Sequence, residues 1–289
     1  MKLENEMLCV EMVEHGAELT RIYNKKTGAE ILWNADPKFW KRHSPVLFPN
    51  VGKTWHNVVK IQGEQYPTSQ HGFARDHDFK CIHAGKEEVK FLLTSTDEMK
   101  EVYPFDFELY ISYRLKKNVI EVEWEIKNPS EETIYFTIGG HPAIHFAKEN
   151  ETKADYQLYF PEKDHLNYIL VDIAEGGADP KKVYEMKLED GYYPLTEELF
   201  ERDALIFDEN QIEEVWISHK DGTPYVGMKC EGFPNFGIWS VKDAPFVCLE
   251  PWMGRCDDVG FDGDISEKPG INSVESGGTF EKSYQIIVG

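Results

Sequence analysis

Side chains that can hold a proton or an anion gather in the stretch TSQHGFARDHDF, residues 68–79. His71 can accept or donate a proton near neutral pH, and Gly72 after it permits a tight turn. An exposed polar turn with solvated charges would have the same composition. We expect His71 to contact a ligand and Arg75 to be its candidate anion contact, and we interpret His77 as an ordinary loop histidine.

A second histidine follows an apolar strand in IYFTIGGHPAIHF, residues 134–146. The two glycines before His141 would let a ligand approach the backbone, and an imidazole at the end of a buried strand is suited to proton transfer. A core histidine bonded to a backbone carbonyl is the alternative interpretation. A metal site made of His71, His141 and His145 can be drawn, but no dedicated metal-ligand spacing supports it, and we predict no metal.

A carboxylate ends an apolar run in APFVCLEPWMGRCDD, residues 244–258. Burial of Glu250 would raise its pKa towards that of a useful general base. We expect Pro251 to stop the strand, whereas Trp252 shares a face with Glu250 if the backbone stays extended, and its ring could then stack on a sugar. A strand-end glutamate in a surface ion pair is the alternative.

Together these segments favour an acid–base pair, one imidazole and one carboxylate, at strand ends. Proton transfer by such groups contributes roughly 10²–10⁴-fold to a rate. The sequence contains no G-x-G-x-x-G after a strand, no P-loop, no H-E-x-x-H and no G-x-S-x-G, which argues against dinucleotide, nucleotide and serine-hydrolase chemistry. A reaction with a modest barrier and no redox or phosphoryl step fits best.

The elements that must position these groups have the period-two pattern of strands. Apolar side chains occupy every odd position of residues 105–115 and alternate with glutamates in residues 119–127, which predicts a long antiparallel hairpin. A helix is predicted at residues 196–206, with Thr196 as its cap. Further strands are predicted at residues 8–13, 18–23, 30–33, 88–94, 133–138, 214–218, 225–230, 236–241, 245–250 and 283–288.

Many short strands without βαβ alternation indicate an all-β fold, a large antiparallel β-sandwich. No internal repeat or long linker divides the 289 residues, so we expect a single domain spanning 1–289, with residues 148–195 as an insertion.

The net charge of −21 makes nucleic acid and anionic membrane surfaces poor partners, although a few local cations could still bind a small anion. The five cysteines form no C-x-x-C pair, and the first residues, MKLENEMLCVEMVEHG, lack the apolar core of a signal peptide. No run of about 18 apolar residues occurs. These features lead us to expect a cytoplasmic protein.

Four segments, in this order, resemble the aldose 1-epimerase (galactose mutarotase) family and especially its LacX-like branch: HGFAR (71–75), GGHPAIHF (139–146), DALIF (203–207) and CLEPWMGRCD (248–257). The likeness extends over nearly the whole chain. It implies the family's antiparallel β-supersandwich and an activity that interconverts the α and β anomers of an aldose by opening and reclosing the ring, with no cofactor.

The resemblance also implies roles for single residues. Glu250 matches the general base that deprotonates the anomeric hydroxyl, and His141 matches the general acid that protonates the ring oxygen. His71 and Asp203 match residues that bind the sugar. Galactose mutarotases carry an arginine before the first histidine, within an asparagine–arginine pair, whereas this chain has FPNVGKTWHN, with Lys53 as the nearest cation and Arg42 further away. The predicted substrate contacts are therefore His71, Asp203, Arg75, Lys53 and Trp252.

Several alternatives stay open. The GFAR run is also similar to the hexose-6-phosphate 1-epimerase branch, in which case Arg75 with Lys53 could hold a phosphate. A carbohydrate-binding protein without turnover would keep the same sugar contacts. Glycoside hydrolysis would need Asp203 or Asp257 as a second carboxylate beside Glu250. The partner is thus a small sugar or sugar phosphate, and the sequence leaves open whether the protein is a monomer or a homodimer.

Overall fold

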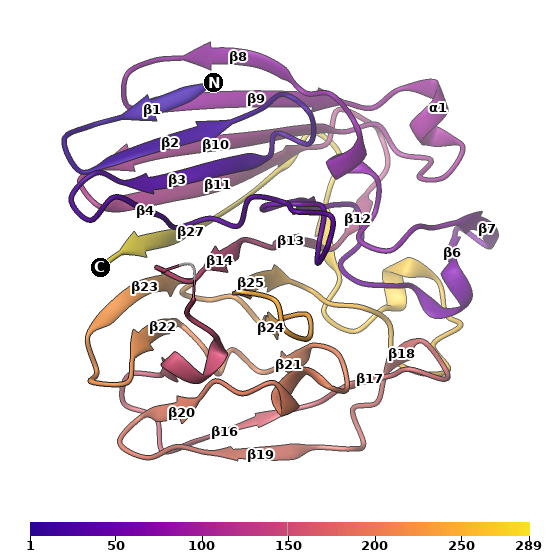
Figure 1. Ribbon diagram of the computed structural model, residues 1–289. Coiled ribbons are helices and arrows are strands. Elements are labelled where there is room, and N and C mark those ends of the chain that lie inside the picture. The colour runs from indigo at the N-terminus through magenta and orange to yellow at the C-terminus, as the bar shows by residue number, and fades with distance from the viewer. Residues whose placement is uncertain (149) are drawn as a thin grey trace.

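The computed structural model describes residues 1–148 and 150–289 and shows a nearly all-β protein (Figure 1). Within these residues the largest sheet is antiparallel and has nine strands. In spatial order they are β20 (Tyr192–Pro194), β15 (Tyr156–Tyr159), β22 (Glu214–His219), β23 (Pro224–Lys229), β27 (Thr279–Val288), β11 (Val119–Lys127), β10 (Glu108–Lys116), β9 (Glu88–Thr94) and β8 (Lys80–Ala84).

Two further sheets are antiparallel as well. A six-stranded sheet contains β21 (Leu205–Phe207), β24 (Asn235–Trp239), β25 (Phe246–Met253), β13 (Ile138–Gly140) and β5 (Val46–Leu47), with β14 (Ala143–His145) also paired to β25. A four-stranded sheet contains β1 (Lys2–Glu4), β2 (Leu8–Met12), β3 (Leu19–Asn24) and β4 (Ala29–Glu30).

The remaining elements are short. Strand pairs are formed by β6 (Val58–Ile61) with β7 (Glu64–Pro67), β12 (Ile134–Phe136) with β26 (Asn272–Val274), β16 (His165–Tyr168) with β19 (Tyr184–Lys187), and β17 (Val171–Asp172) with β18 (Gly177–Ala178). The helical turns are α1 (Asp97–Lys100), η1 (Trp55–Asn57), η2 (Ala74–Asp76), η3 (Lys153–Asp155), η4 (Glu198–Phe200) and η5 (Ile265–Glu267). No helix in the described part of the chain has the length and apolar character that crossing a bilayer requires.

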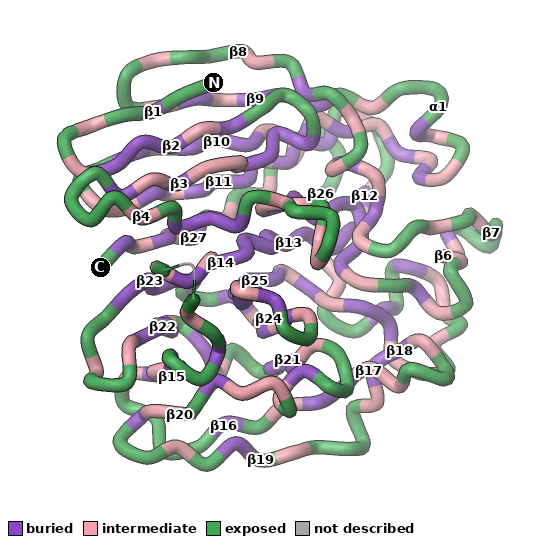
Figure 2. Tube along the Cα trace, viewed as in Figure 1, coloured by how far each residue is buried: buried purple, intermediate pink, exposed green. Residues whose placement is uncertain are grey.

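The core lies between the nine-stranded sheet and the other two sheets. Apolar side chains of β9, β10 and β11 join those of β2 and β3, and side chains of β22 and β23 join those of β24 and β25, in one continuous buried cluster. Trp124 on β11 is completely buried in it. Figure 2 shows buried residues along the central strands and exposed ones at the outer hairpins such as β7. The expected all-β sandwich is confirmed.

The long hairpin is confirmed as β10 paired with β11, and each predicted strand range overlaps an observed strand. The helix predicted at residues 196–206 is wrong. Only the single turn η4 forms, Asp203 has a positive φ of 76°, and the chain then enters β21, which pairs with β24. The buried apolar run 205–207 gains more from pairing inside the sheet than from a local helix, so tertiary context overrides the local pattern.

The prediction that Pro251 stops the strand is also wrong, because β25 continues to Met253. Leu249 donates its N–H to the carbonyl of Pro142, so the nitrogen of Pro251, two residues on, faces the same side. On that side, β25 pairs first with β14 and then with β13, and Pro251 lies at the gap between these two pairings. The missing N–H of Pro251 therefore costs no ladder hydrogen bond.

Strand β25 is buried on both faces. Val247 and Leu249 point into the main core, whereas Cys248 belongs to a second apolar cluster on the opposite face. Period two puts Glu250 and Trp252 on the same side as Cys248. A catalytic candidate is thus carried by a strand that the core holds from behind.

Candidate active site

A cavity of about 510 Å³ opens above this second face of β25. We call it the polar cavity. Its size lies within the range of small-molecule sites. All seven residues that the sequence singled out for catalysis and substrate binding line it: Glu250, His141, His71, Asp203, Arg75, Lys53 and Trp252.

Glu250 and His141 form a buried pair at the floor of the polar cavity. The Nε2 atom of His141 lies 3.2 Å from Oε1 of Glu250, and the two residues are 6% and 1% exposed, respectively. Glu250 comes from the middle of β25, and His141 follows directly after β13, the strand that pairs with β25. Two neighbouring strands therefore bring the carboxylate and the imidazole into contact.

Burial sets the proton balance of this pair. It raises the pKa of Glu250 well above its usual range, and the nearby charge of Asp203 raises it further. Burial lowers the pKa of His141 to about 3, with a further contribution from Arg75 and Arg42. Both shifts favour the uncharged forms of the two groups, a carboxylic acid beside a neutral imidazole.

Aromatic side chains hold the imidazole of His141 in place. The ring of Trp40 stacks on it at a centroid distance of 4.8 Å, and Trp239 meets it edge-on at 5.6 Å. Both tryptophans line the polar cavity. Sequence reasoning missed them, because Trp40 lies outside any strand and its loop has no pattern that points to His141.

The backbone of Gly52, in the wall of the polar cavity, holds the ring of His71. Its Nδ1 accepts a hydrogen bond of 3.0 Å from the N–H of Gly52, so Nε2 carries the proton and can donate to a ligand. Burial and the neighbouring His141 keep the pKa of His71 well below its usual range. The turn requires Gly72, because a Cβ there would lie 2.2 Å from the carbonyl oxygen of Phe48.

The polar cavity is rich in cations although the whole chain is acidic. Lys41, Arg42, Lys53 and Arg75 line it. Arg42 binds Asp76 at 2.7 Å, whereas Arg75 donates from Nη2 to the carbonyl of Gln70 and its buried Nε has no hydrogen-bond partner among the described residues. Burial and Arg42 lower the pKa of Arg75 to about 10. Arg42, which is distant in sequence, thus belongs to the site together with Arg75.

Asp203 lies at the rim of the polar cavity, where it is exposed. Its positive φ and the hydrogen bond from the N–H of Ala204 to its carboxylate, 2.8 Å long, define a turn just before β21. The turn lets an exposed carboxylate reach a cavity whose floor is buried.

Three other candidate residues lie elsewhere. His145 stacks on Trp33 at 5.8 Å and does not line the polar cavity, so the set His71, His141 and His145 is not brought together. His77 packs edge-on against Phe73. Asp257 is buried in an ion pair of 2.7 Å with Lys268.

One cluster has donor atoms of the kind that zinc accepts. The ligand atoms of His141, Cys248 and Glu250 lie within 4.8 Å of one another, and all three residues are buried. Burial and the neighbouring Glu250 raise the pKa of the Cys248 thiol well above its usual range. A metal here would have to displace protons from a buried thiol and a buried carboxyl group, which opposes binding.

Comparison with known proteins gives consistent results. The sequence model of the family described as aldose 1-epimerase matches residues 1–257. The plasmid-encoded protein LacX of Lactococcus lactis subsp. lactis is 29% identical over 296 residues, covering 100% of this chain and 99% of LacX.

Two solved structures have the same fold over the whole chain. A galactose mutarotase related enzyme from Lactobacillus acidophilus is 32% identical with a TM-score of 0.94, covering 100% of this chain and 97% of that one. A galactose mutarotase-like protein from Lactobacillus casei is 26% identical with a TM-score of 0.90, covering 100% and 99%.

Proposed function

Because the chain belongs to the aldose 1-epimerase family, we propose that it is a cofactor-independent aldose 1-epimerase that interconverts the α and β anomers of a hexose. The observation that carries this proposal is the contact of 3.2 Å between His141 and Glu250 at the floor of the polar cavity. The anomeric hydroxyl and the ring oxygen of a pyranose are attached to the same carbon. A carboxylate and an imidazole that nearly touch can therefore serve both oxygens at once.

In ring opening, Glu250 takes the proton of the anomeric hydroxyl while His141 gives a proton to the ring oxygen. The O–H electrons form the carbonyl bond as the bond between C1 and O5 breaks. After rotation about C1–C2 the two groups exchange roles and close the ring on the other face. One proton is taken up and one is released in each direction, so the pair returns to its starting state.

The two pKa shifts favour a protonated Glu250 and a neutral His141, whereas ring opening needs the proton on His141. A sugar hydroxyl that donates a hydrogen bond to Glu250 favours the ionised carboxylate. This shifts the shared proton towards Nε2 of His141, which can then give it to the ring oxygen. Substrate binding itself thus prepares the acid and the base.

The other residues of the polar cavity bind the sugar in this proposal. His71 donates from Nε2 to a hydroxyl, and Asp203 accepts from ring hydroxyls at the rim. Trp252, on the same face of β25 as Glu250, offers an aromatic surface to the sugar ring. Lys53 has no ion-pair partner among the described residues and stays available at the rim of the cavity.

A hexose 6-phosphate is the second candidate substrate. Four cations line the polar cavity, and the buried Nε of Arg75 has no hydrogen-bond partner in the described part of the chain, its nearest carboxylate oxygen being Oδ2 of Asp76 at 3.7 Å. A phosphate accepts charge-assisted, bidentate hydrogen bonds from arginine. This local excess of positive charge supports a phosphorylated sugar in spite of the net charge of −21.

Polarimetry tests the proposal. Freshly dissolved α-D-glucose, α-D-galactose and their 6-phosphates are each followed with wild type, Glu250→Gln and buffer alone. We expect wild type to accelerate the decay of rotation and Glu250→Gln to lose the acceleration. A wild type that binds these sugars by calorimetry yet accelerates none of them would instead indicate a carbohydrate-binding protein.

A further inference from the structure

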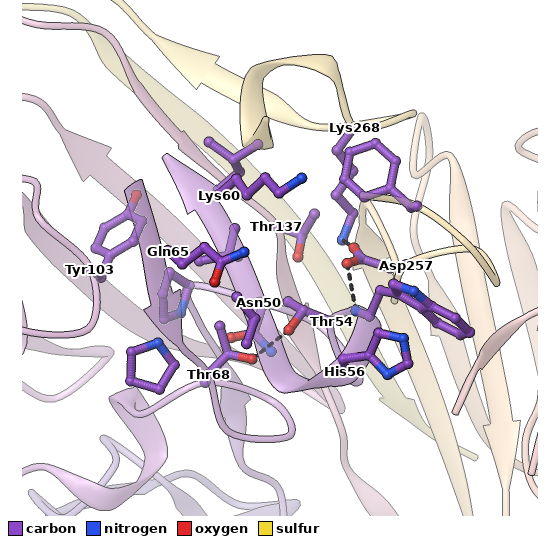
Figure 3. Close-up of a pocket in the computed structure, with 18 of the residues that line it drawn as sticks. Asn50, Thr54, His56, Lys60, Gln65, Thr68, Tyr103, Thr137, Asp257 and Lys268 are labelled. Carbon is purple, nitrogen blue, oxygen red and sulfur yellow. Dashed lines mark hydrogen bonds and ion pairs between the residues drawn. The ribbon is translucent and has the colours of Figure 1, made fainter. Parts of the chain in front are cut away.

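A second cavity, of about 800 Å³, lies beside the hairpin of β6 and β7 and the turn η5 (Figure 3). It is larger than the polar cavity and shares no lining residue with it. Most of its wall is apolar. We call it the apolar cavity and define it by Trp55, Val59, Tyr103, Phe261, Ile265 and Ile271.

Polar side chains interrupt this wall at several places. Figure 3 shows Tyr103 at one end and the pair Asp257 and Lys268 at the other. Asn50 is 8% exposed and donates from Nδ2 to two backbone carbonyls, while its own side-chain oxygen accepts no hydrogen bond from the described residues. A largely apolar wall with polar groups that the protein holds in place is typical of a small-molecule site.

The charges of the apolar cavity cancel. Lys268 lies 2.7 Å from a carboxylate oxygen of Asp257, and Lys60 bonds to the carbonyl of Asp262 and lies 4.0 Å from its carboxylate. A charged ligand would therefore bring an uncompensated charge into a largely apolar space, which is unfavourable. An uncharged ligand has no such cost.

The apolar and polar cavities lie on two sides of one wall. At three places in the sequence, adjacent residues line different cavities. Lys53, Gln70 and Cys256 line the polar cavity. Their neighbours Thr54, Ser69 and Asp257 line the apolar cavity. The side chain of Asn50 donates to the carbonyls of Gly52, at 2.9 Å, and Ser69, at 3.0 Å.

The same stretch of wall holds His71. Gly52 accepts a hydrogen bond of 2.7 Å from the N–H of His71 and donates one of 3.0 Å to its ring. A ligand group bound to Asn50 would thus contact the side chain that holds Gly52, and Gly52 orients His71.

We propose that the apolar cavity binds an uncharged amphipathic small molecule, with an apolar body and a hydroxyl or N–H group for Asn50, and that its occupancy changes sugar affinity through His71. The coupling rests on the proposed function, whereas the binding does not. Since His71 contacts the sugar without carrying the transferred protons, occupancy changes KM and leaves kcat unchanged. By linkage, bound sugar changes the affinity of the apolar cavity by the same factor.

Binding is tested with N-phenyl-1-naphthylamine, an uncharged fluorophore with two aromatic parts and one N–H group. We expect saturable 1:1 binding to wild type. Val102→Trp and Gln65→Trp each place an indole in the apolar cavity and are expected to weaken binding by roughly tenfold or more. Gln65 is exposed, so this second variant is available if Val102→Trp folds poorly.

Ile82→Trp is the matched control, because Ile82 is 42% exposed on β8 and does not line the apolar cavity. Equal probe affinity in wild type, control and both filled variants would overturn the proposal, as would the absence of saturable binding. Probe that hexose displaces competitively from wild type would place it in the polar cavity and would also overturn it. Anilinonaphthalene sulfonate, the charged counterpart, is expected to bind at least roughly tenfold more weakly.

The coupling is tested by sugar kinetics and by calorimetric sugar binding with and without saturating probe. We expect a change of roughly threefold or more in KM and in the dissociation constant of the sugar, with kcat unchanged. Sugar affinity that stays the same with the probe bound would overturn the coupling. Calorimetry gives this answer even if the protein does not catalyse mutarotation, so the failure of the proposed function can be told from the failure of the coupling.

Discussion

The two cavities place buried carboxylates in opposite electrostatic settings. Glu250, at the floor of the polar cavity, has an imidazole as its contact and no cationic partner in the described residues, so burial raises its pKa. Asp257, in the wall of the apolar cavity, is paired with Lys268 at 2.7 Å. In the first arrangement the carboxyl group has a raised pKa, whereas in the second an ion pair compensates the charge of the carboxylate. Glu250 and Asp257 are thus both buried but differ in their partners, and four experiments test this contrast.

The strongest effects should come from Glu250→Gln, which is expected to lower kcat, and from Asp257→Asn, which is expected to lower stability. Glu250→Gln should lower kcat by roughly 10²–10⁴-fold, because the amide cannot accept the proton. Asp257→Asn should retain activity per folded molecule but lose about 3–5 kcal/mol of the free energy of unfolding, because Lys268 stays buried without a counter-charge. Polarimetry and urea unfolding measure the two quantities.

One result would contradict the separate roles of Glu250 and Asp257. If Asp257→Asn lost as much kcat as Glu250→Gln while remaining folded by circular dichroism, Asp257 would be part of the chemistry, and the separation of the two cavities would be wrong.

The next effect concerns the cations. Arg75→Met should lower kcat/KM for a hexose 6-phosphate by roughly 10–100-fold, since it removes charge-assisted hydrogen bonds, and should change the value for the free hexose by less than about threefold. Lys60→Met is the matched control, because Lys60 lines the apolar cavity. Equal losses on both substrates would indicate that Arg75 supports the Gln70 turn and does not bind a phosphate.

A smaller effect is expected from the wall between the cavities. Asn50→Ala removes the hydrogen bond from Asn50 to the carbonyl of Gly52, so His71 loses its fixed position. KM should therefore rise by roughly 3–10-fold. We expect kcat to stay within about twofold, because Glu250 and His141 are unchanged. Thr68→Val is the control, since the hydroxyl of Thr68 bonds to that of Thr54 in the same cavity and has no hydrogen bond to Gly52 among the described residues. A fall in kcat in Asn50→Ala, with KM constant, would contradict a positioning role.

The smallest effect is on stability. The pKa of Glu250 is raised in the folded state, so its contribution to stability is fully present below the unfolded pKa and is lost as pH rises towards the folded pKa. Glu250→Gln has no such loss, so its melting temperature should exceed that of wild type by about 2–4 °C at pH 8 and match it near pH 4. A gain that persists unchanged at pH 4 would show that titration of Glu250 is not its cause.

Much of the fold followed from local pattern. The alternation in residues 105–115 and 119–127 predicted β10 and β11, because one face of a strand must be apolar wherever a core covers it. The helix predicted at residues 196–206 failed, since its apolar residues satisfy both a helical and a strand interpretation and only the neighbouring strand β24 decides between them. The prediction that Pro251 stops the strand failed for a related reason. The cost of a missing N–H depends on whether the neighbouring strand has a carbonyl at that position.

The residue types of the site could be identified from the sequence: a carboxylate after Val-Cys-Leu, a histidine after two glycines, and a histidine before a turn glycine. Three features could be seen only in the folded chain: Glu250 contacts His141, Trp40 and Trp239 pack against the imidazole, and Arg42 lines the same cavity as Arg75. Local sequence fixes backbone preference and which face is apolar, because these depend on neighbours along the chain. Contact between side chains, and the pKa shifts that follow from it, depend on strand pairing and burial, which arise from residues far apart in the chain.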